Sequence, residues 1–230
     1  MIRWDLRGVS PYKAQAISHP SVQLGLQEGR SRVHGVVKGR SSYWLRNTGE
    51  IFGIKFRPGA FYPFLKRPLS TITNRSIPIT QIFGEDTKEL ERSVLGLEFG
   101  PSRARVAEEF LRHRLPERDE NALFAGEIIE EICLNRDIVS VDRVVERFGL
   151  NKRRLQRMFN TYIGVTPKWV IKLYRLHECV ERLNSDEKVD FAELAQDAGY
   201  FDQAHFVKDF KSVVGHTPGG YLKQLRMQPG

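Results

Sequence analysis

The chain has 230 residues, 40% of them hydrophobic, which is enough for one large core or two modest ones. No apolar stretch approaches the roughly 20 residues that span a bilayer, and no basic and apolar run near the start is typical of a secretion signal. We therefore expect a cytoplasmic protein without a membrane partner. The formal net charge of +8 favours a nucleic-acid partner, but Lys and Arg exceed Asp and Glu by 20 to 13 in residues 1–120 and only by 16 to 15 in residues 121–230.

Residues 1–83 are predicted to form a small β domain for sensing or dimerisation. Apolar and other residues alternate over 22–26 and 51–57, where Phe52, Ile54 and Phe56 share one face. Glycines separate these short segments at frequent intervals. The pattern indicates a small barrel or sandwich.

The titratable residues of this domain predict no cofactor. A metal-binding barrel needs clustered His and carboxylate ligands, whereas His19 and His34 are isolated in the sequence. We interpret both as surface or core-edge residues and expect no metal. Arg40, Arg57 and His34 suggest an acidic small-molecule effector inside the barrel, although cations on the outer face of strands are the commoner explanation.

Residues 84–120 are predicted to form a helical linker. Two helices, over 86–95 and 102–115, flank a Gly-Pro pair. The second helix carries Val106, Phe110 and Leu111 at helical spacing, an apolar stripe that looks exposed.

An internal repeat organises residues 121–230. Segment 141–172 matches 191–223 at an offset of 50 residues, which becomes 51 after one insertion. The identical positions are two glycines, a phenylalanine, a threonine and a proline, found in the first copy at Gly149, Phe159, Gly164, Thr166 and Pro167. Identities of these types indicate a shared backbone plan.

Each copy predicts a short helix, a tight turn and a second helix, which is a helix-turn-helix unit. In the first copy Gly149 ends the first helix, where a left-handed residue is usual, and Asn151 caps the second. Gly199 and Asp202 have the same roles in the second copy. Each second helix has one apolar face to bury and one polar face to expose.

A long helix, predicted over 167–184, joins the units at 141–164 and 191–215. Thr166-Pro167 starts it, because Thr caps a helix and the missing N–H of Pro needs no partner at the first position. Its length of roughly 25 Å fits the roughly 34 Å between successive major-groove faces of B-DNA. Glycines after the second Thr-Pro weaken the prediction of a last helix.

The exposed faces of the two second helices carry the candidate DNA contacts. A basic cluster near the start of the first one lies where the helix dipole favours phosphate, and its Arg and Gln side chains suit guanine and adenine. The other has fewer donors and should discriminate bases less. On the long helix, Lys168 and Lys172 are phosphate candidates and Arg175 is interpreted as structural. The predicted DNA-binding residues are Lys152, Arg153, Arg154, Gln156, Arg157, Gln203, Ala204 and Lys208.

Residues 122–225 resemble the C-terminal domain of the AraC/XylS family of bacterial transcription regulators. The resemblance rests on GLNKRRLQRMF at 149–159, AGYFDQAHF at 198–206 and GHTP at 215–218. It implies an all-α domain of seven helices that carries two helix-turn-helix units. It also implies that the following positions approach DNA: Arg153, Gln156, Arg157, Gln203, Ala204 and Lys208.

The run FRPGAFYPFL at 56–65 is similar to the cupin-like sensory domain of one subgroup of this family. The resemblance implies an effector, RNA polymerase as a partner, and a homodimer in which linker helices pair. Relatives carry a further segment before the match to residues 4–8, so a shortened domain is expected. The expected fold is thus α+β with two domains, a cupin-like β-barrel with linker helices and then the all-α domain.

Other functions compete with a DNA-binding regulator. An adaptor would use the same helices to bind another protein, and in a plain helical bundle the Arg and Gln side chains would merely be solvated. A cupin-type enzyme would need metal ligands, and a DNA-repair methyl acceptor would need a reactive cysteine. We interpret Cys133 and Cys179 as small core residues without a disulfide, because both have apolar neighbours at helical spacing. The repeat favours an effector-responsive transcription regulator, an activator with no catalytic role.

Overall fold

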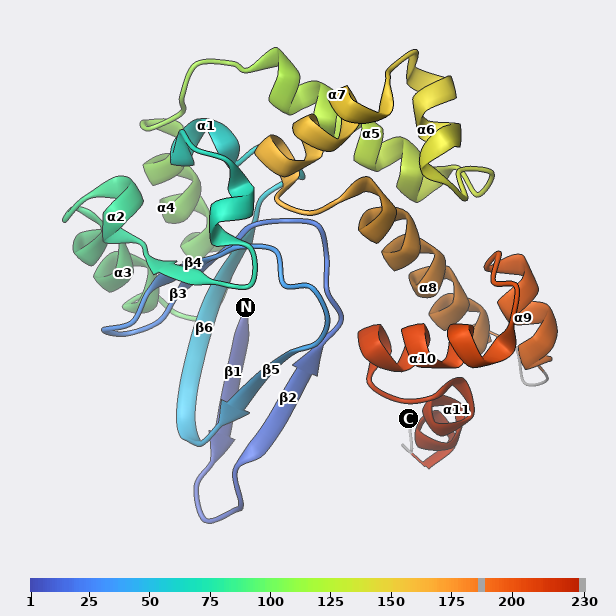
Figure 1. Cartoon of the computed structure of the whole chain (residues 1–230). Helices are drawn as coiled ribbons and strands as arrows, with labels where there is room; N and C mark the ends of the chain where they lie inside the picture. The colour runs from blue at the N-terminus through green and yellow to red at the C-terminus, as the bar shows by residue number, and fades with distance from the viewer. Residues whose placement is uncertain (186–188, 228–230) are drawn as a thin grey trace.

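The computed structural model describes residues 1–185 and 189–227, in which a sheet-containing first part precedes a helical second part (Figure 1). This order confirms the α+β architecture expected from the sequence. The end of the predicted 121–230 domain, residues 228–230, lies outside the described residues, as do residues 186–188. In the described ranges every helix is too short or too polar to traverse a lipid bilayer.

The strands of the first part form two antiparallel sheets. Five strands make the larger sheet in the order β1-β6-β3-β4-β7, and β2 pairs with β5 in a two-stranded ribbon. The strands are β1 Ile2–Leu6, β2 Tyr12–Ala16, β3 Gln23–Leu26, β4 Arg32–His34, β5 Ser41–Leu45, β6 Asn47–Lys55 and β7 Ser76–Pro78.

The described strands do not close into the expected barrel. Closure requires strand pairing all the way round the sheet, whereas β2 and β5 of the described chain pair with each other alone. β5 ends at Leu45 and β6 begins at Asn47, whose φ of 51° is the left-handed conformation that turns the chain between them. The ribbon folds away from the larger sheet (Figure 1), so the β-rich prediction is confirmed and the barrel prediction is wrong.

One hydrophobic core joins the larger sheet to the helices of the first part. Leu24 of β3 and Val94 of α3 are fully buried in it. Val106 and Phe110 of α4 pack against the same core. The stripe predicted on this helix is thus partly buried within the chain, and the pairing of linker helices across a dimer stays a prediction. The helical elements here are α1 Tyr62–Leu65, the 3-10 helix η1 Leu69–Ile72, α2 Thr80–Phe83, α3 Thr87–Leu95 and α4 Pro101–Arg112.

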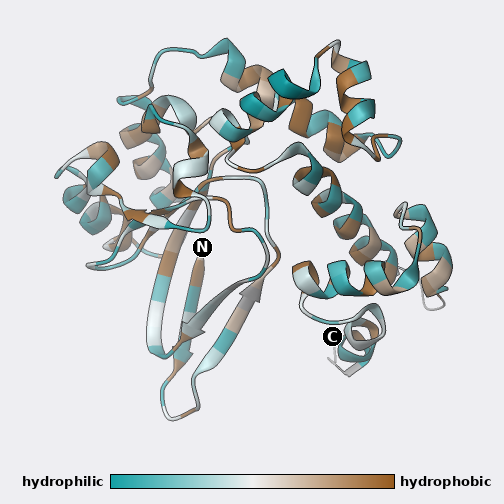
Figure 2. Ribbon diagram, in the orientation of Figure 1, coloured by the Kyte–Doolittle hydropathy of each residue, from teal (hydrophilic) through white to brown (hydrophobic). Residues whose placement is uncertain are grey.

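The second part contains the seven expected helices within its described residues. Figure 2 shows hydrophobic and hydrophilic residues alternating along these helices, as expected for amphipathic helices. The last helix forms in spite of Gly219 and Gly220, because the Thr217 hydroxyl accepts a hydrogen bond from the Gly220 N–H over 3.1 Å. The helices are α5 Glu120–Leu134, α6 Val141–Phe148, α7 Lys152–Met158, α8 Pro167–Ser185, α9 Phe191–Asp197, α10 Gln203–Val214 and α11 Pro218–Met227.

Two cores stabilise the second part, one for each repeat. Leu155 is fully buried in the first and Phe206 in the second. α8 contributes to both, since Val170 enters the first core and Leu176 the second. The long helix therefore fixes the position of one repeat relative to the other.

The first part packs directly on the first repeat. The Thr73 hydroxyl donates a hydrogen bond to the Gly164 carbonyl over 2.5 Å, and the ring centroids of Tyr62 and Tyr162 lie 4.6 Å apart. Val36, from the loop between β4 and β5, is buried in the core of that repeat. These contacts make the two parts one packed body.

Candidate nucleic-acid interface

Local signals build both helix-turn-helix units as predicted. The Asn151 side chain accepts a backbone hydrogen bond over 2.8 Å at the start of α7, and Asp202 accepts one over 2.7 Å at the start of α10. Gly149 and Gly199 adopt φ angles of 60° and 66° in the turns that precede these caps. The caps and turns together set the directions of α7 and α10, which are the two candidate helices for reading DNA bases.

α7 presents its basic cluster to solvent. Leu155 and Met158 are buried on its inner side. Its Lys152 ammonium lies 2.5 Å from the Asp142 carboxylate in an exposed ion pair. Within the described residues, the three arginines of the cluster have no ion pair, so their guanidinium groups are available to a ligand. The exposed residues of this face are Lys152, Arg153, Arg154, Gln156 and Arg157.

α7 continues into a π-helical turn, Phe159–Ile163, where the sequence predicted one regular helix up to Gly164. The Gly164 N–H bonds to the Phe159 carbonyl over 2.8 Å, the wider spacing of a π turn. Phe159 is fully buried and Tyr162 meets the first part of the chain. The irregular turn therefore lies where the reading helix ends and the other part begins.

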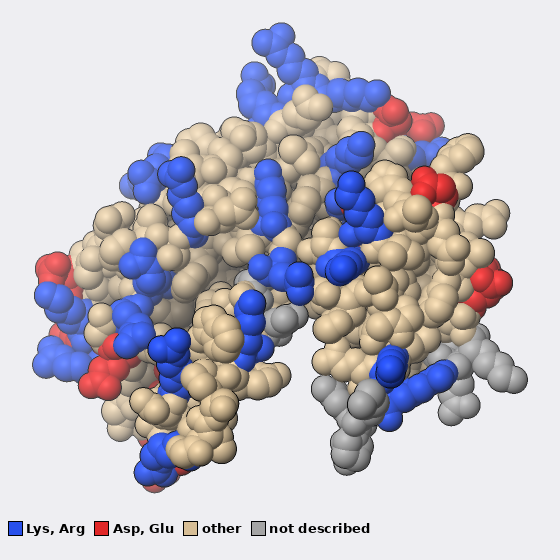
Figure 3. Space-filling view, turned by 60° about the horizontal axis from the view of Figure 1, so that its bottom comes forward, with Lys and Arg blue, Asp and Glu red and all other residues tan. Residues whose placement is uncertain are grey.

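α10 exposes a face with fewer donors, as expected. Phe206 and Phe210 are fully buried, whereas Gln203, Ala204 and Lys208 are exposed. Figure 3 shows Lys and Arg side chains across the middle of one face of the molecule, from the sheet part to the helical part, with Asp and Glu toward its margins. All eight predicted DNA contacts are thus on the surface, and contact with DNA itself stays a prediction.

A cleft of about 650 Å³ separates the two units along α8. The Lys172 ammonium lies 3.2 Å from the Asp209 carboxylate of α10, which also accepts a hydrogen bond from the Tyr200 hydroxyl over 3.1 Å. Lys172 therefore ties α8 to the second unit. The sequence did not predict this network. It also did not single out Phe201, which is fully exposed beside the network. The signal available for Phe201 was its position as an aromatic residue in the turn.

Arg175 also has a structural role, in agreement with its interpretation from the sequence. Its Nη1 donates a hydrogen bond to the Val139 carbonyl over 3.3 Å, and its guanidinium lies 5.7 Å from the centre of the Tyr200 ring. Burial lowers the pKa of this guanidinium. Arg175 thus bridges the start of the first unit and the turn of the second.

The two cysteines occupy different environments. Cys179 is buried, and burial raises the pKa of its thiol to about 12. Cys133 is exposed, which corrects its interpretation as a core residue, yet partial desolvation raises the pKa of its thiol as well. A reactive cysteine needs a lowered pKa, so neither thiol suits a methyl acceptor. Among the described residues, no group of three or more His, Cys, Asp or Glu side chains is arranged to hold a metal ion.

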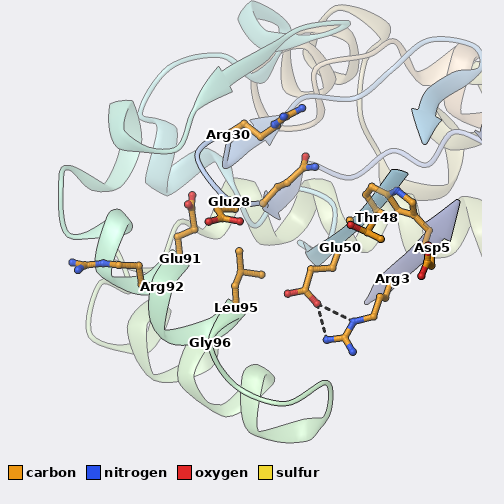
Figure 4. A pocket seen from close by; sticks show the side chains of 13 residues that line it. Arg3, Asp5, Glu28, Arg30, Thr48, Glu50, Glu91, Arg92, Leu95 and Gly96 are labelled. Atoms are coloured by element: carbon orange, nitrogen blue, oxygen red, sulfur yellow. Dashed lines mark hydrogen bonds and ion pairs between the residues drawn. The ribbon is translucent and has the colours of Figure 1, made fainter. Parts of the chain in front are cut away.

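An open cavity of about 970 Å³ lies in the first part, between β1, β6 and α3. Figure 4 shows Glu28 and Glu91 on one side, the Arg3–Glu50 ion pair on the other, and Leu95 between them. Two arginines surround Glu50, since the buried Arg103 also donates to it over 3.0 Å. The hydrogen bond from Arg103 is the main reason why the pKa of Glu50 is lowered.

The residues proposed from the sequence for an acidic effector do not line this cavity. Arg40 and Arg57 are exposed, and His34 is half-buried with its ring 6.5 Å from that of Tyr43. Because the sheet does not close, these residues do not face a shared barrel interior. The effector site predicted from them is therefore not formed.

Two helix-turn-helix units mounted on one helix define a DNA-binding protein of the tandem type. A helix-turn-helix domain model, HTH_18, matches residues 144–224, and a domain of unknown function, DUF6597, matches residues 1–78. With the relatives described next, these findings show that the chain belongs to the AraC/XylS family of transcription regulators.

Curated relatives match part of this chain. "XylDLEGF operon transcriptional activator 1" of Pseudomonas putida is 31% identical over 105 residues, which cover 44% of this chain and 31% of that protein. "Regulatory protein SoxS" of Salmonella typhimurium is 32% identical over 87 residues, which cover 38% of this chain and 80% of SoxS. A crystal structure of an apo ToxT variant from Vibrio cholerae matches 97% of this chain and 92% of its own, at 12% identity and a TM-score of 0.40. The chain thus spans about a third of the length of the first curated relatives, and 31% of the length of the Pseudomonas putida activator.

Proposed function

We propose that the protein is a sequence-specific transcription regulator that places α7 and α10 in successive major grooves of DNA. The main support is that both helices bury an apolar face in their own core and expose a polar one, while α8 holds the two cores together. α8 has 19 residues, about 28 Å at 1.5 Å per residue, close to the roughly 34 Å repeat of the major groove. Arg153, Gln156 and Arg157 read most of the bases. α10 contacts the DNA backbone and fixes the position of the protein along the duplex.

Arg157→Ala tests the base-reading role. An arginine that bonds a guanine edge is worth roughly 1–3 kcal/mol on its specific site and less on random DNA. Fragments selected from genomic DNA by the wild-type protein would be measured by gel shift and footprinting, with two protected stretches expected about one helical turn apart. Arg105→Ala, an exposed arginine on α4, is the matched control and should change neither affinity.

Two results would contradict this function. An equal loss of affinity on specific and random DNA would remove the reading role of Arg157. Failure of the wild-type protein to bind any fragment at low salt would favour the alternative, an adaptor that uses the same helices to bind another protein.

We also propose that a small charged effector binds the cavity between β1, β6 and α3. Its walls carry charges of both signs, and within the described residues Glu28 has no ion pair that would occupy it. Thermal melting against a panel of amines, amino acids and neutral sugars would find a charged ligand that raises the melting temperature. Glu28→Gln should abolish that shift and Glu117→Gln, an exposed carboxylate in the 116–119 loop, should not. Equal shifts from the neutral sugars would contradict the proposal.

The names of two relatives describe transcriptional activators, which supports a proposal about the cellular role. We propose a cytoplasmic activator without a catalytic role that contacts RNA polymerase. Transcription in vitro from a bound fragment, with and without the protein, tests this role. Less transcript in its presence would make the protein a repressor.

We propose that the protein is a homodimer held by a surface other than α4, because Val106 and Phe110 already pack against the core of the first part. The exposed aromatic side chain of Trp44 on β5 of the ribbon marks the alternative surface. Sedimentation at micromolar concentration should give a dimer that Trp44→Ser dissociates. A wild-type monomer would contradict the proposal.

A further inference from the structure

The loop between β4 and β5, residues 35–40, touches both helix-turn-helix units. Val36 is buried in the core of the first unit. Gly39 lies against α10 of the second unit, where a Cβ on Gly39 would be 3.8 Å from the Ser212 carbonyl oxygen. Ser212 is exposed and lies one helical turn after Lys208. The loop therefore stands at the flank of the second reading helix.

Hydrogen bonds fix the position of this loop. The Lys38 N–H donates to Asn74 Oδ1 over 2.7 Å, and the Asn74 N–H donates to the Val36 carbonyl over 2.9 Å. The buried Ser18 hydroxyl donates to the Gly39 carbonyl. Asn74 follows Thr73, which bonds to the first unit. The loop is thus fixed within the first part, beside the second unit, before any ligand binds, which lowers the entropic cost of binding.

The first part carries more positive charge than its own acidic residues neutralise. Residues 1–119 contain 20 Lys and Arg against 12 Asp and Glu, a net charge of +8 that equals the net charge of the whole chain. Lys38 and Arg40 are exposed, and within the described residues no ion pair involves either of them. Uncompensated like charges repel each other and favour an anionic partner. Figure 3 shows how Lys and Arg continue from this part toward the helices.

We propose that Lys38 and Arg40 bind phosphates of the same DNA duplex that α10 reads, so that the first part of the chain contributes directly to DNA binding. This inference rests on the proposed function. Phosphate contacts carry no sequence information, so their loss should weaken binding to specific and random DNA by the same factor. The slope of log affinity against log salt is negative, and two lost contacts should make it shallower by about 1.8, since each phosphate contributes about 0.9.

The experiment compares the K38Q/R40Q double variant with the wild-type full chain. Lys38 holds Asn74 through its backbone N–H and Arg40 is exposed, so the fold should be retained, as thermal melting would show. K88Q/R105Q removes the same charge from exposed positions on α3 and α4 and is the control. Affinity for a selected fragment and for random DNA would be measured between about 50 and 200 mM salt.

The expected result is a slope shallower by about 1.8 and an affinity roughly 60-fold weaker at about 0.1 M salt on both DNAs, with the control near wild type. An unchanged slope in K38Q/R40Q, or an equal change in the control, would overturn this inference alone. Tighter binding by K38Q/R40Q would also overturn it, because the loop would then obstruct the duplex. Absence of any binding by the wild-type protein would overturn the proposed function and this inference with it.

Discussion

Gly199 packs against Arg175 so closely that a side chain cannot be added without movement. A Cβ at Gly199 would lie 2.0 Å from Nη2 of Arg175, and the backbone φ is 66°. Gly149, at the equivalent position of the first unit, has a φ of 60°, and no described atom lies within 4 Å of where its Cβ would be. The two glycines share a backbone requirement and differ in their neighbour, so Gly149→Ala is the matched control for Gly199→Ala.

We expect Gly149→Ala to lower the free energy of unfolding by about 1–2 kcal/mol, the cost of a left-handed L residue. Gly199→Ala should cost about 1–2 kcal/mol more, because Arg175 must give up its place over the Tyr200 ring and its hydrogen bond to the Val139 carbonyl. The affinity for DNA should fall as well, since the turn that aims α10 is displaced.

Arg175→Ala completes a double-mutant cycle. Without the guanidinium, the methyl group of Gly199→Ala meets no obstacle, so the change should cost only the backbone penalty of about 1–2 kcal/mol. Urea unfolding followed by circular dichroism gives the four free energies. The same cost of Gly199→Ala with and without Arg175 would refute the reasoning, and so would equal costs at the two glycines.

Three other changes address the cap, the contact between the parts and the pH dependence. Asp202→Ala should lower the free energy of unfolding by about 0.5–2 kcal/mol and Asp202→Asn much less, because Asn also caps helices; urea unfolding would show whether they differ. Thr73→Val leaves the buried Gly164 carbonyl unpaired and should cost about 1–3 kcal/mol, with faster hydrogen exchange at the end of α7 as the local readout. Burial, more than any charge, lowers the pKa of His19 from 6.5 to about 4, so the unfolded chain binds the proton more readily. The free energy of unfolding should therefore fall as the pH drops from about 6.5 to about 4, and His19→Phe should reduce that dependence in urea unfolding at both pH values.

The helix-turn-helix units were predictable because their signals act over a few residues. A left-handed glycine ends a helix and an Asn or Asp side chain starts the next one, wherever the rest of the chain lies. Gly149, Asn151, Gly199 and Asp202 all behave in this way. The repeat also presented each signal twice, which separated it from chance.

The first part was less predictable because its arrangement depends on contacts between distant residues. Alternation identified the strands, but only the pairing of β6 with β1 and β3 determines whether a sheet closes. Val106 and Phe110 have helical spacing whether the stripe meets its own sheet or a second copy. Cys133 has the same ambiguity, since apolar neighbours along a helix do not tell on which side of it a residue faces.

The cores explain why the two units are related differently to the rest of the chain. The first unit takes Val36 of the first part into its core and bonds to Thr73 through the Gly164 carbonyl, so a movement of the sheet reaches the end of α7. The second unit has a core of its own and is positioned by α8. Since α7 carries the basic cluster, a ligand in the first part that shifts these contacts would act on the helix with the most candidate base-reading donors. The loop at residues 35–40 would change affinity through the DNA backbone, which leaves the choice of sequence to α7.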